Sequence, residues 1–460
     1  MNRLLAFFLG VGRRFFHVSP QGLLVQWFGA LILAGTLLLM LPWSHASGRV
    51  GWLDAFFTAT SAACVTGLVV KNTGGDFTPF GQCVILLLIQ MGGLGIMTFA
   101  ALAFRMVRSR FSLASQLALE ESFVQRGLAA EFRRGFWQMI RLVAVIEALG
   151  AAALFAALLP GRGAIHALFS SCFHSVSAFC NAGFSLYSDN LAGLRENGPA
   201  LGVVMLLIVL GGLGHPVLLE LYQALPAGLT RRRHFAKPRR FSLHARVVLL
   251  VTGLLIAAGA LGLFFFGLPP EAGGGGQALE SSLFLSISSR TAGFNTISTG
   301  ALPVPSILLL IFLMFVGGSP GSCAGGVKTT TWAVWLAHLR AGLKGEKEVR
   351  LLGRSLPDDL TARAGNVVSL GLLWNAAGVL LLALTEHPAV SLRDLFFEQI
   401  SAFGTVGLST GLTPHLTSFG RLWIIFTMFI GRIGPLTMVF AFVAQRAARI
   451  RHPEGRVMIG

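Results

Sequence analysis

Long apolar runs alternate with short polar and glycine-containing segments along most of the chain. One of these apolar runs, residues 305–316, is about half as long as the others and is followed by the glycine-rich stretch GGSPGSCAGGVKTT (317–330). This pattern predicts a helical protein that crosses a membrane several times. The other seven runs reach the ~20 residues that span a bilayer as a helix, and they cover residues 22–42, 83–104, 138–159, 200–219, 246–267, 366–385 and 422–444.

Four short segments between these runs resemble one another. Aligned on their last glycine, they place Gly67, Gly183, Gly293 and Gly407 in register, at intervals of 116, 110 and 114 residues. Each has helical character but is too short to cross a bilayer, which is typical of a re-entrant helix. The segments are FFTATSAACVTGL (56–68), CFHSVSAFCNAGF (172–184), SLFLSISSRTAGF (282–294) and FFEQISAFGTVGL (396–408).

A second glycine-containing element follows each segment and begins at Gly92, Gly211, Gly317 or Gly431. We therefore predict an all-α integral membrane protein built from four repeats of span, pore helix and span. Its eight transmembrane helices and four re-entrant helices would surround one central pore with quasi-fourfold symmetry. The predicted boundaries are 1–21 for a cytoplasmic or interfacial N-terminus, 22–110, 111–240, 241–345 and 346–445 for the four repeats, and 446–460 for a cytoplasmic C-terminus.

The charges support a membrane orientation rather than a nucleic-acid partner. Only 12% of residues are charged, against roughly 25% in ordinary soluble domains. The net charge of +17 comes from short basic clusters, and 27 of the 36 Lys and Arg residues lie in five segments between or beyond the spans. By the positive-inside rule these segments and both termini are cytoplasmic. They are 1–21, 105–141, 221–246, 340–365 and 445–460.

The four aligned glycines predict a cation pathway. Glycine tolerates a positive φ angle, which allows successive backbone carbonyls to point the same way and to replace the water around an ion. The alternative is that these glycines only allow close helix packing. The predicted filter residues are Val65, Thr66, Gly67, Asn181, Ala182, Gly183, Thr291, Ala292, Gly293, Thr405, Val406 and Gly407.

The stretch 317–330, here called the gating loop, is close to a phosphate-binding loop but does not match it. Val327 stands where that motif has lysine, and Lys328 comes one residue late. Because proline and several glycines cannot hold a regular helix, we predict an intramembrane gate below the filter. Its predicted residues are Gly317, Gly318, Ser319, Gly321, Gly325, Gly326 and Lys328.

Lys328 and Arg432 are the two basic residues predicted inside spans, where a charge is expensive. We expect Arg432 to form a barrier below the filter; the alternative is a partner for a carboxylate or for free carbonyls of another helix. Glu147 is predicted to pair with an arginine, and Glu220 is predicted to lie at the interface between membrane and water. Neither residue is assigned a role in transport. His174 is predicted to be a packing residue.

Six motifs carry a resemblance that extends over essentially the whole chain. SAACVTGLVV, FCNAGFS, RTAGFNT, FGTVGLSTG, GGSPGSCAGGVKT and FIGRIGPLT resemble the Trk/Ktr/HKT superfamily of potassium transporters. The first repeat begins without the extra N-terminal spans typical of TrkH, so the chain most resembles KtrB-type pore subunits. The resemblance implies that the aligned glycines belong to a selectivity filter. Glycine rather than serine at position 67 implies that K⁺ is the transported ion.

The resemblance also implies partners and a location. It implies a bacterial plasma membrane protein, a homodimer of pore subunits, and a cytosolic ring of nucleotide-binding (KtrA/TrkA-like) regulatory subunits. Uptake by such subunits is commonly stimulated by Na⁺, although the sequence contains no recognisable sodium site. The chain itself is predicted to bind no nucleotide. The basic segments 105–127 and 230–241 are candidates for docking this ring or for attraction to anionic lipid.

Three other functions compete with this interpretation. One is a Na⁺-conducting or poorly selective cation transporter of the same superfamily. Another is a secondary transporter with a midplane substrate site, which predicts two inverted repeats rather than four repeats with the same order of elements. An enzyme would need a cluster of acids, a nucleophile or metal ligands in the spans, and the sequence has none, so we predict that the protein is not an enzyme.

Overall fold

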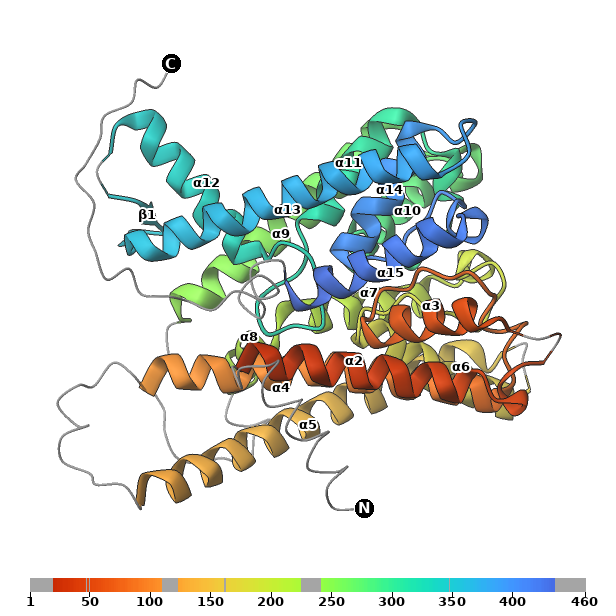
Figure 1. Cartoon of the computed structure of the whole chain (residues 1–460), viewed down its shortest axis with the longest axis horizontal. Helices are drawn as coiled ribbons and strands as arrows, with labels where there is room; N and C mark the ends of the chain where they lie inside the picture. Colours follow the sequence, from red (N-terminus) through yellow and green to blue (C-terminus); the bar gives the residue numbers. More distant parts are fainter. Residues whose placement is uncertain are drawn as a thin grey trace, which may run out of the picture.

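The structure is a computed structural model that describes residues 20–46, 48, 50–109, 123–160, 163–224, 241–346 and 348–434. Most of these residues are helical. The longer helices run roughly along the long axis of the molecule, and the short helices that precede the aligned glycines gather in one half of it (Figure 1). A small hairpin lies at the opposite end (Figure 1).

The helices can be grouped by the aligned glycine that they flank. Around the first glycine they are α2 (Pro20–Leu39), α3 (Trp52–Ala63) and α4 (Pro79–Ser109); around the second, α5 (Phe123–Leu158), α6 (Ala164–Phe179), α7 (Gly198–Leu213) and α8 (His215–Ala224). Around the third they are α9 (Leu243–Phe266), α10 (Gly276–Ser288), α11 (Val304–Phe315) and α12 (Thr329–Lys344); around the fourth, α13 (Asp358–Thr385), α14 (Leu392–Gly404) and α15 (Ser418–Ile433). Helices α3, α6, α10 and α14 precede the aligned glycines and are called the pore helices below.

Four helices in the described ranges are long and apolar enough to cross a membrane. These spans lie in α2, α5, α9 and α13, and α7 with α8 would form a fifth, bent by 108°. Helix α11 is too short to cross alone, and α15 ends at Ile433, next to the end of the described residues. The count of eight spans therefore stays a prediction, whereas the multi-pass character is clear.

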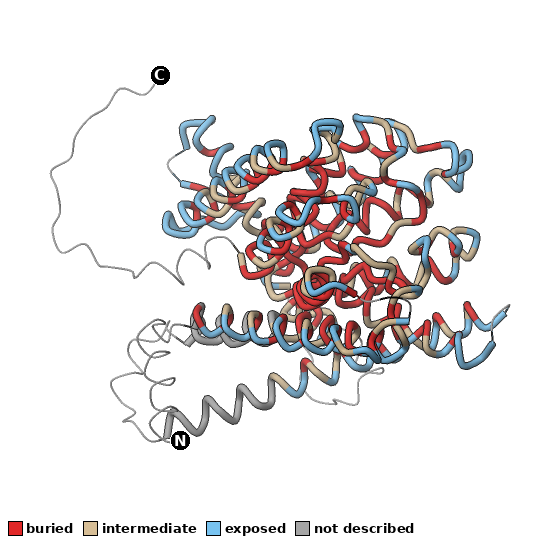
Figure 2. The backbone as a smooth tube through the Cα atoms, turned by 45° about the vertical axis from the view of Figure 1, so that its right-hand side comes forward, coloured by how far each residue is buried: buried red, intermediate tan, exposed pale blue. Residues whose placement is uncertain are grey.

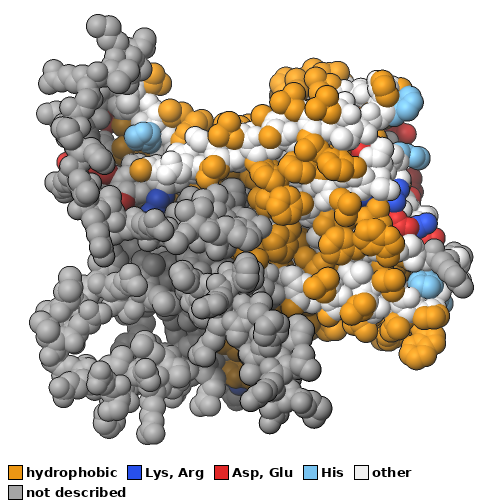
Figure 3. Space-filling view, in the orientation of Figure 1, with side chains coloured by type: hydrophobic (Ala, Val, Ile, Leu, Met, Phe, Trp, Pro, Cys, Tyr) orange, Lys and Arg blue, Asp and Glu red, His pale blue; other side chains and the backbone are white. Residues whose placement is uncertain are grey.

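The outer surface of the long helices is strongly apolar. Leu37 on α2, Phe265 on α9 and Leu384 on α13 are 68%, 78% and 86% exposed. Figure 3 shows hydrophobic side chains spread over the described part of one face, and Figure 2 shows buried positions concentrated where the helices meet. An apolar surface of this extent would be unfavourable in water and suits contact with lipid. The protein is a multi-pass membrane protein.

One element departs from the all-α prediction. Strands β1 (Arg350–Leu351) and β2 (Arg354–Ser355) form an antiparallel hairpin in a segment predicted to be a cytoplasmic loop. Its two turn residues, Leu352 and Gly353, both have positive φ angles, 48° and 77°, as a tight type I′ hairpin turn requires. Strands of two residues leave no alternating pattern long enough to recognise in a sequence.

Three of the glycines that begin the second recurring element, Gly92, Gly211 and Gly431, allow a pore helix to pack closely on the following span. A Cβ atom on Gly92 would overlap the carbonyl oxygen of Ala63, and one on Gly211 would overlap that of Phe179. Gly431 has the same relation to Phe403. Each of these carbonyls lies four residues before an aligned glycine, in the last turn of a pore helix. Close packing is therefore the role of these glycines, as small residues commonly provide in membranes.

Candidate functional site

The four pore helices end just before the aligned glycines, and the backbone then turns sharply. The residue two positions before each glycine has a positive φ angle: 55° at Val65, 58° at Asn181, 80° at Thr291 and 49° at Thr405. The glycines themselves have φ angles of 94°, 69°, 74° and 94°. Left-handed backbone at non-glycine residues is uncommon and worth a functional explanation. Its occurrence at matched positions in all four segments indicates one shared backbone shape.

The four glycines form a closed ring. A Cβ atom on Gly67 would lie 3.1 Å from the Cα atom of Gly183, and one on Gly183 would lie 3.1 Å from that of Gly293. A Cβ on Gly293 would lie 3.0 Å from the Cα atom of Gly407, and one on Gly407 would lie 2.9 Å from that of Gly67. Each built Cβ also meets the carbonyl oxygen of the residue before the next glycine. The structure thus brings the segments that hold all 12 predicted filter residues together at one place.

Serine side chains hold these segments against their pore helices. The Ser61 hydroxyl donates to the carbonyl of Leu68 at 2.7 Å and accepts from the Gly67 N–H at 3.1 Å. Ser401 makes the same two bonds to Leu408 and Gly407, at 2.6 and 3.2 Å. Ser177 donates to Phe184 and Ser288 to Phe294. The recurrence of serine was visible in the sequence, but no role followed from it there, because its partner is the backbone beyond the glycine.

The gating loop packs directly against two of these segments. A Cβ on Gly317 would lie 3.4 Å from Cγ2 of Thr291, and one on Gly325 would overlap the side chain of Thr405. The N–H of Gly317 donates to the carbonyl of Val327 at 2.9 Å, which closes the base of the loop. The interruption after residue 316 was predicted; α11 ends at Phe315 and α12 begins at Thr329.

The loop also binds to a second helix break, which lies between α7 and α8. Gly214 has a φ angle of 85° and separates α7 from α8. Pro216 has no N–H to bond the carbonyl of Gly212, and that carbonyl accepts from the Ser319 N–H at 3.0 Å. In return, the N–H of His215 donates to the carbonyl of Gly321, also at 3.0 Å. The break in one repeat thus supplies the partners that the loop of the next repeat needs.

The predicted cations both contact the gating loop. Arg432, 2% exposed, donates to the carbonyl of Cys323 in the loop and to that of Gly92 in α4, the latter at 2.8 Å. This geometry matches the alternative of a partner for free carbonyls and also places the guanidinium beside the loop. The ammonium group of Lys328 donates to the carbonyls of Ala324 and Gly325 within the loop itself.

A third buried cation, Arg290, is not among the residues that the sequence singled out. Arg290 lies two residues after the end of α10, is 7% exposed, and donates to the carbonyls of Gly317 and Thr252, each at 3.4 Å. Its position between a pore helix and a filter segment was the signal that could have found it.

The two acidic residues have other partners than expected. The carboxylate of Glu147 accepts from the Gln90 amide at 3.1 Å and lies 4.0 Å from the Cys180 thiol. No arginine among the residues that the structure describes forms an ion pair with Glu147, so the pairing with arginine stays a prediction. Glu220 accepts from the N–H and the hydroxyl of Ser242, at 3.0 and 2.7 Å, where α9 begins.

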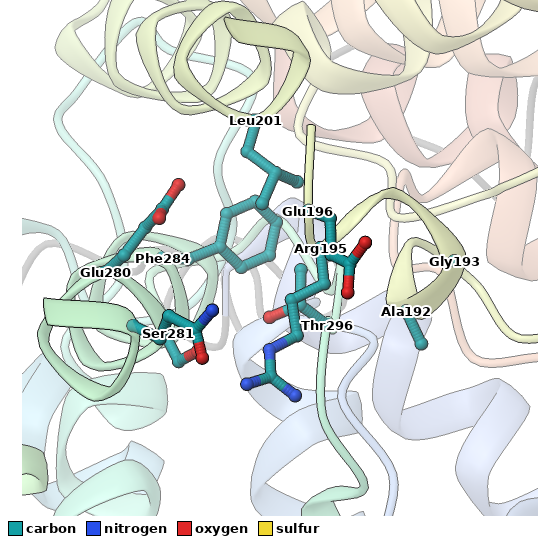
Figure 4. Close-up of a pocket in the computed structure, with 10 residues that line it drawn as sticks. Ala192, Gly193, Arg195, Glu196, Leu201, Glu280, Ser281, Phe284 and Thr296 are labelled. Carbon is teal, nitrogen blue, oxygen red and sulfur yellow. The ribbon is translucent and has the colours of Figure 1, made fainter. Parts of the chain in front are cut away.

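A pocket of about 620 Å³ lies beside α10 and the segment that precedes α7 (Figure 4). Arg195, Glu196 and Glu280 line it together with Leu201 and Phe284. Its charged residues are partly exposed, and the sequence reasoning had not singled them out.

Comparison with known proteins decides the family. Residues 19–450 match the model of the TrkH family, which is described as cation transport proteins. The chain belongs to the TrkH family. Among its relatives are the Ktr system potassium uptake protein B of Bacillus subtilis (strain 168), 39% identical, and the potassium/sodium uptake protein NtpJ of Enterococcus hirae, 36% identical. These alignments cover 96% of this TrkH-family chain in both cases, and 96% and 98% of the relatives.

A solved structure supports the fold. The potassium transporter TrkH from Vibrio parahaemolyticus matches with a TM-score of 0.70 over 91% of this chain and 83% of its own, at 18% identity. At that identity the match concerns the TrkH fold alone. The relatives are transporters and not enzymes, which is consistent with the prediction that this family member is not an enzyme.

Proposed function

We propose that this TrkH-family chain is the ion-translocating subunit of a bacterial potassium uptake system. The observation that carries the proposal is the closed ring of four glycine-containing segments, each with the same pair of left-handed residues. Relatives of nearly full length are named as potassium uptake proteins. The natural location of such a subunit is the bacterial plasma membrane, with both termini in the cytoplasm as the basic clusters indicate.

The ring supports a carbonyl-lined filter for dehydrated K⁺. The 12 filter residues would direct their backbone carbonyls to a common axis, where stacked oxygens replace the hydration shell of the ion. Four pore helices end at this ring, and the negative ends of their dipoles would favour a cation there. In this proposal the four repeats at 22–110, 111–240, 241–345 and 346–445 surround the axis with quasi-fourfold symmetry, through eight spans.

The gating loop would close the pathway below the filter. Its packing against Thr291 and Thr405, and its attachment to α7, α8 and Arg432, support this role. Opening would require the loop to exchange these bonds for others. Gly317, Gly318, Ser319, Gly321, Gly325, Gly326 and Lys328 would form the moving barrier, and Arg432 would hold it closed.

We assign control of the loop to a cytosolic ring of nucleotide-binding regulatory subunits, with the pore subunit as a homodimer. The naming of the relatives as parts of a Ktr system supports additional subunits. Of the two basic segments expected to meet such partners or anionic lipid, residues 110–122 and 230–240 lie outside the described residues. Activation by Na⁺ stays a prediction, as does the absence of a nucleotide site in this chain.

A second candidate is a pathway that conducts Na⁺ as well as K⁺. It is favoured by one observation, that a relative 36% identical over nearly its whole length is named as a potassium/sodium uptake protein. The two candidates share the ring and differ in its dimensions.

Growth at low potassium tests the proposed function. The gene should restore growth of a potassium-transport-deficient bacterium when it is expressed with a regulatory subunit, and the rescued cells should accumulate K⁺. Failure to rescue, with normal amounts of the protein in the membrane, would contradict the proposal. Rescue in which Na⁺ accumulates equally would favour the second candidate.

A further inference from the structure

The position nine residues before each aligned glycine lies on a pore helix, behind the filter segment that comes after it. It is occupied by Thr58, His174, Phe284 and Glu398 in the four repeats. Both ionisable members are buried: His174 is 2% exposed and Glu398 is 0% exposed. A buried ionisable side chain is costly unless hydrogen bonds compensate it, so the partners of these two residues require an explanation.

Glu398 binds the backbone segment that leaves the fourth filter segment. Its carboxylate accepts from the hydroxyl of Ser409, two residues after Gly407, and from the hydroxyl of Thr413 at 2.7 Å. The two hydroxyl oxygens are 3.1 Å apart, and Ser409 also accepts from the N–H of Gly411 at 2.9 Å. One carboxylate thus fixes both ends of a five-residue turn directly beyond the filter.

His174 makes the matching contact in the second repeat. Its Nε2 atom lies 3.0 Å from the hydroxyl of Ser185, two residues after Gly183, and Nδ1 lies 2.7 Å from the carbonyl of Ser170. The Ser185 hydroxyl donates to the carbonyl of Asn190 at 2.9 Å, and the Asn190 amide donates to the carbonyl of Gly183 at 3.4 Å. These bonds connect the pore helix to the filter glycine itself.

The two contacts occupy opposite corners of the ring. Gly183 is adjacent to Gly67 and Gly293, and Gly407 is adjacent to the same two glycines. In the remaining repeats the corresponding side chains make no hydrogen bond to their filter segments within the described residues. Thr58 is buried with no partner for its hydroxyl in the described residues, and Phe284 lines the pocket with Leu201 and Thr296 (Figure 4).

We propose that Glu398 and His174 are positioning residues that fix the outer ends of two diagonally opposite filter segments and thereby set the discrimination between K⁺ and Na⁺. The inference rests on the proposed function of the ring. Discrimination between ions depends on how firmly the coordinating oxygens are held and at what spacing. Supporting side chains behind a site give it this precision. All four segments share the serine contacts, and two of them have Glu398 or His174 as a second support.

Cation flux into liposomes that contain the purified protein together with its regulatory subunit tests the proposal. We expect Glu398→Gln, which keeps the size of the side chain but leaves one hydroxyl without its acceptor, to change the ratio of K⁺ to Na⁺ flux. The expected change is about fivefold, the factor that corresponds to one net hydrogen bond. His174→Phe replaces the imidazole with an aromatic ring that can still stack on Tyr187, but it removes both ring nitrogens. We expect it to change the flux ratio in the same direction as Glu398→Gln does.

Thr58→Val is the matched control, because it removes a hydroxyl from the corresponding position of the first repeat without breaking a bond to the filter. It should leave the flux ratio unaltered. Thr413→Val and Ser409→Ala remove the partners of Glu398 from the other side, and Glu398→Gln with Thr413→Val should change the ratio less than the sum of the two single changes.

A flux ratio equal to wild type in both Glu398→Gln and His174→Phe would overturn the inference while leaving the proposed function intact. If these two variants fail to reach the membrane, an unaltered ratio in Thr413→Val and Ser409→Ala overturns it instead. A wild-type protein that carries no K⁺ would contradict the proposed function, and the inference would fall with it.

Discussion

At the scale of single residues, several contacts in this protein leave no room for a side chain. Gly92, Gly211 and Gly431 lie against the last carbonyls of three pore helices. Each lets a span approach its pore helix more closely than alanine would allow, and this approach fixes how far the pore helix reaches into the molecule. The position of a filter segment therefore depends on a glycine that is not part of it.

Replacement of Gly211 by alanine tests this dependence. The added Cβ would overlap the carbonyl oxygen of Phe179, so the variant should be less stable by roughly 1–3 kcal/mol or more, as overpacked cores commonly are. Thermal unfolding of the purified protein in detergent would measure the loss. Gly202→Ala on the same helix is the control, since nothing lies within 4 Å of its Cβ position. Equal midpoints for the two variants would contradict the packing role.

At the scale of elements, the gating loop and the break between α7 and α8 depend on each other. Because the loop is not helical, its N–H groups have no hydrogen-bond partners within a helix. The break likewise leaves the carbonyls of Gly211 and Gly212 without helical partners. In the interior of a membrane protein such groups must find partners within the protein. The loop and the break therefore supply each other's hydrogen-bond partners. Arg432 adds a charged donor that connects the loop to α4 by hydrogen bonds.

Arg432→Ala should raise cation flux, because it removes both the positive charge and the two hydrogen bonds that hold the loop. Flux through wild-type and variant protein in liposomes would measure the effect. Arg432→Lys separates the two causes: it keeps the charge but cannot bond both carbonyls in the same way. Flux that stays low in the lysine variant assigns the barrier to charge, and flux that rises assigns it to the bonds. Unchanged flux in Arg432→Ala would exclude both.

The elements also show what the sequence could and could not predict. The short helix before the gating loop was predicted at 305–316 and is found at Val304–Phe315. It could be predicted because a run of apolar residues that ends at several glycines is a local signal. The helix break at Gly214 and the burial of Arg290 are not evident from the sequence. Both depend on partners distant in sequence: Arg290 binds Gly317 and Thr252, and no local pattern records such a contact.

At the scale of the whole molecule, the repeats, the ring and the apolar surface form one consistent account. The alignment of four glycines predicted that segments more than 100 residues apart would meet, and the ring brings them together. The supports behind the ring could not be predicted in the same way. The four repeats have different residues at the position of His174 and Glu398. An alignment that searches for shared residues therefore reveals the glycines of the ring but not these two side chains.

Potassium and sodium flux through the purified protein, reconstituted in liposomes together with its regulatory subunit, tests the central claim most directly. The account predicts that the wild-type protein carries K⁺ and that Gly67→Ser lowers the ratio of K⁺ to Na⁺ flux, because a side chain there meets the carbonyl of Ala182 in the next segment of the ring. Gly202→Ser, at an open position on α7, should leave the ratio as it is. Absence of K⁺ flux in the wild type, or an unaltered ratio in folded Gly67→Ser protein, would contradict the account.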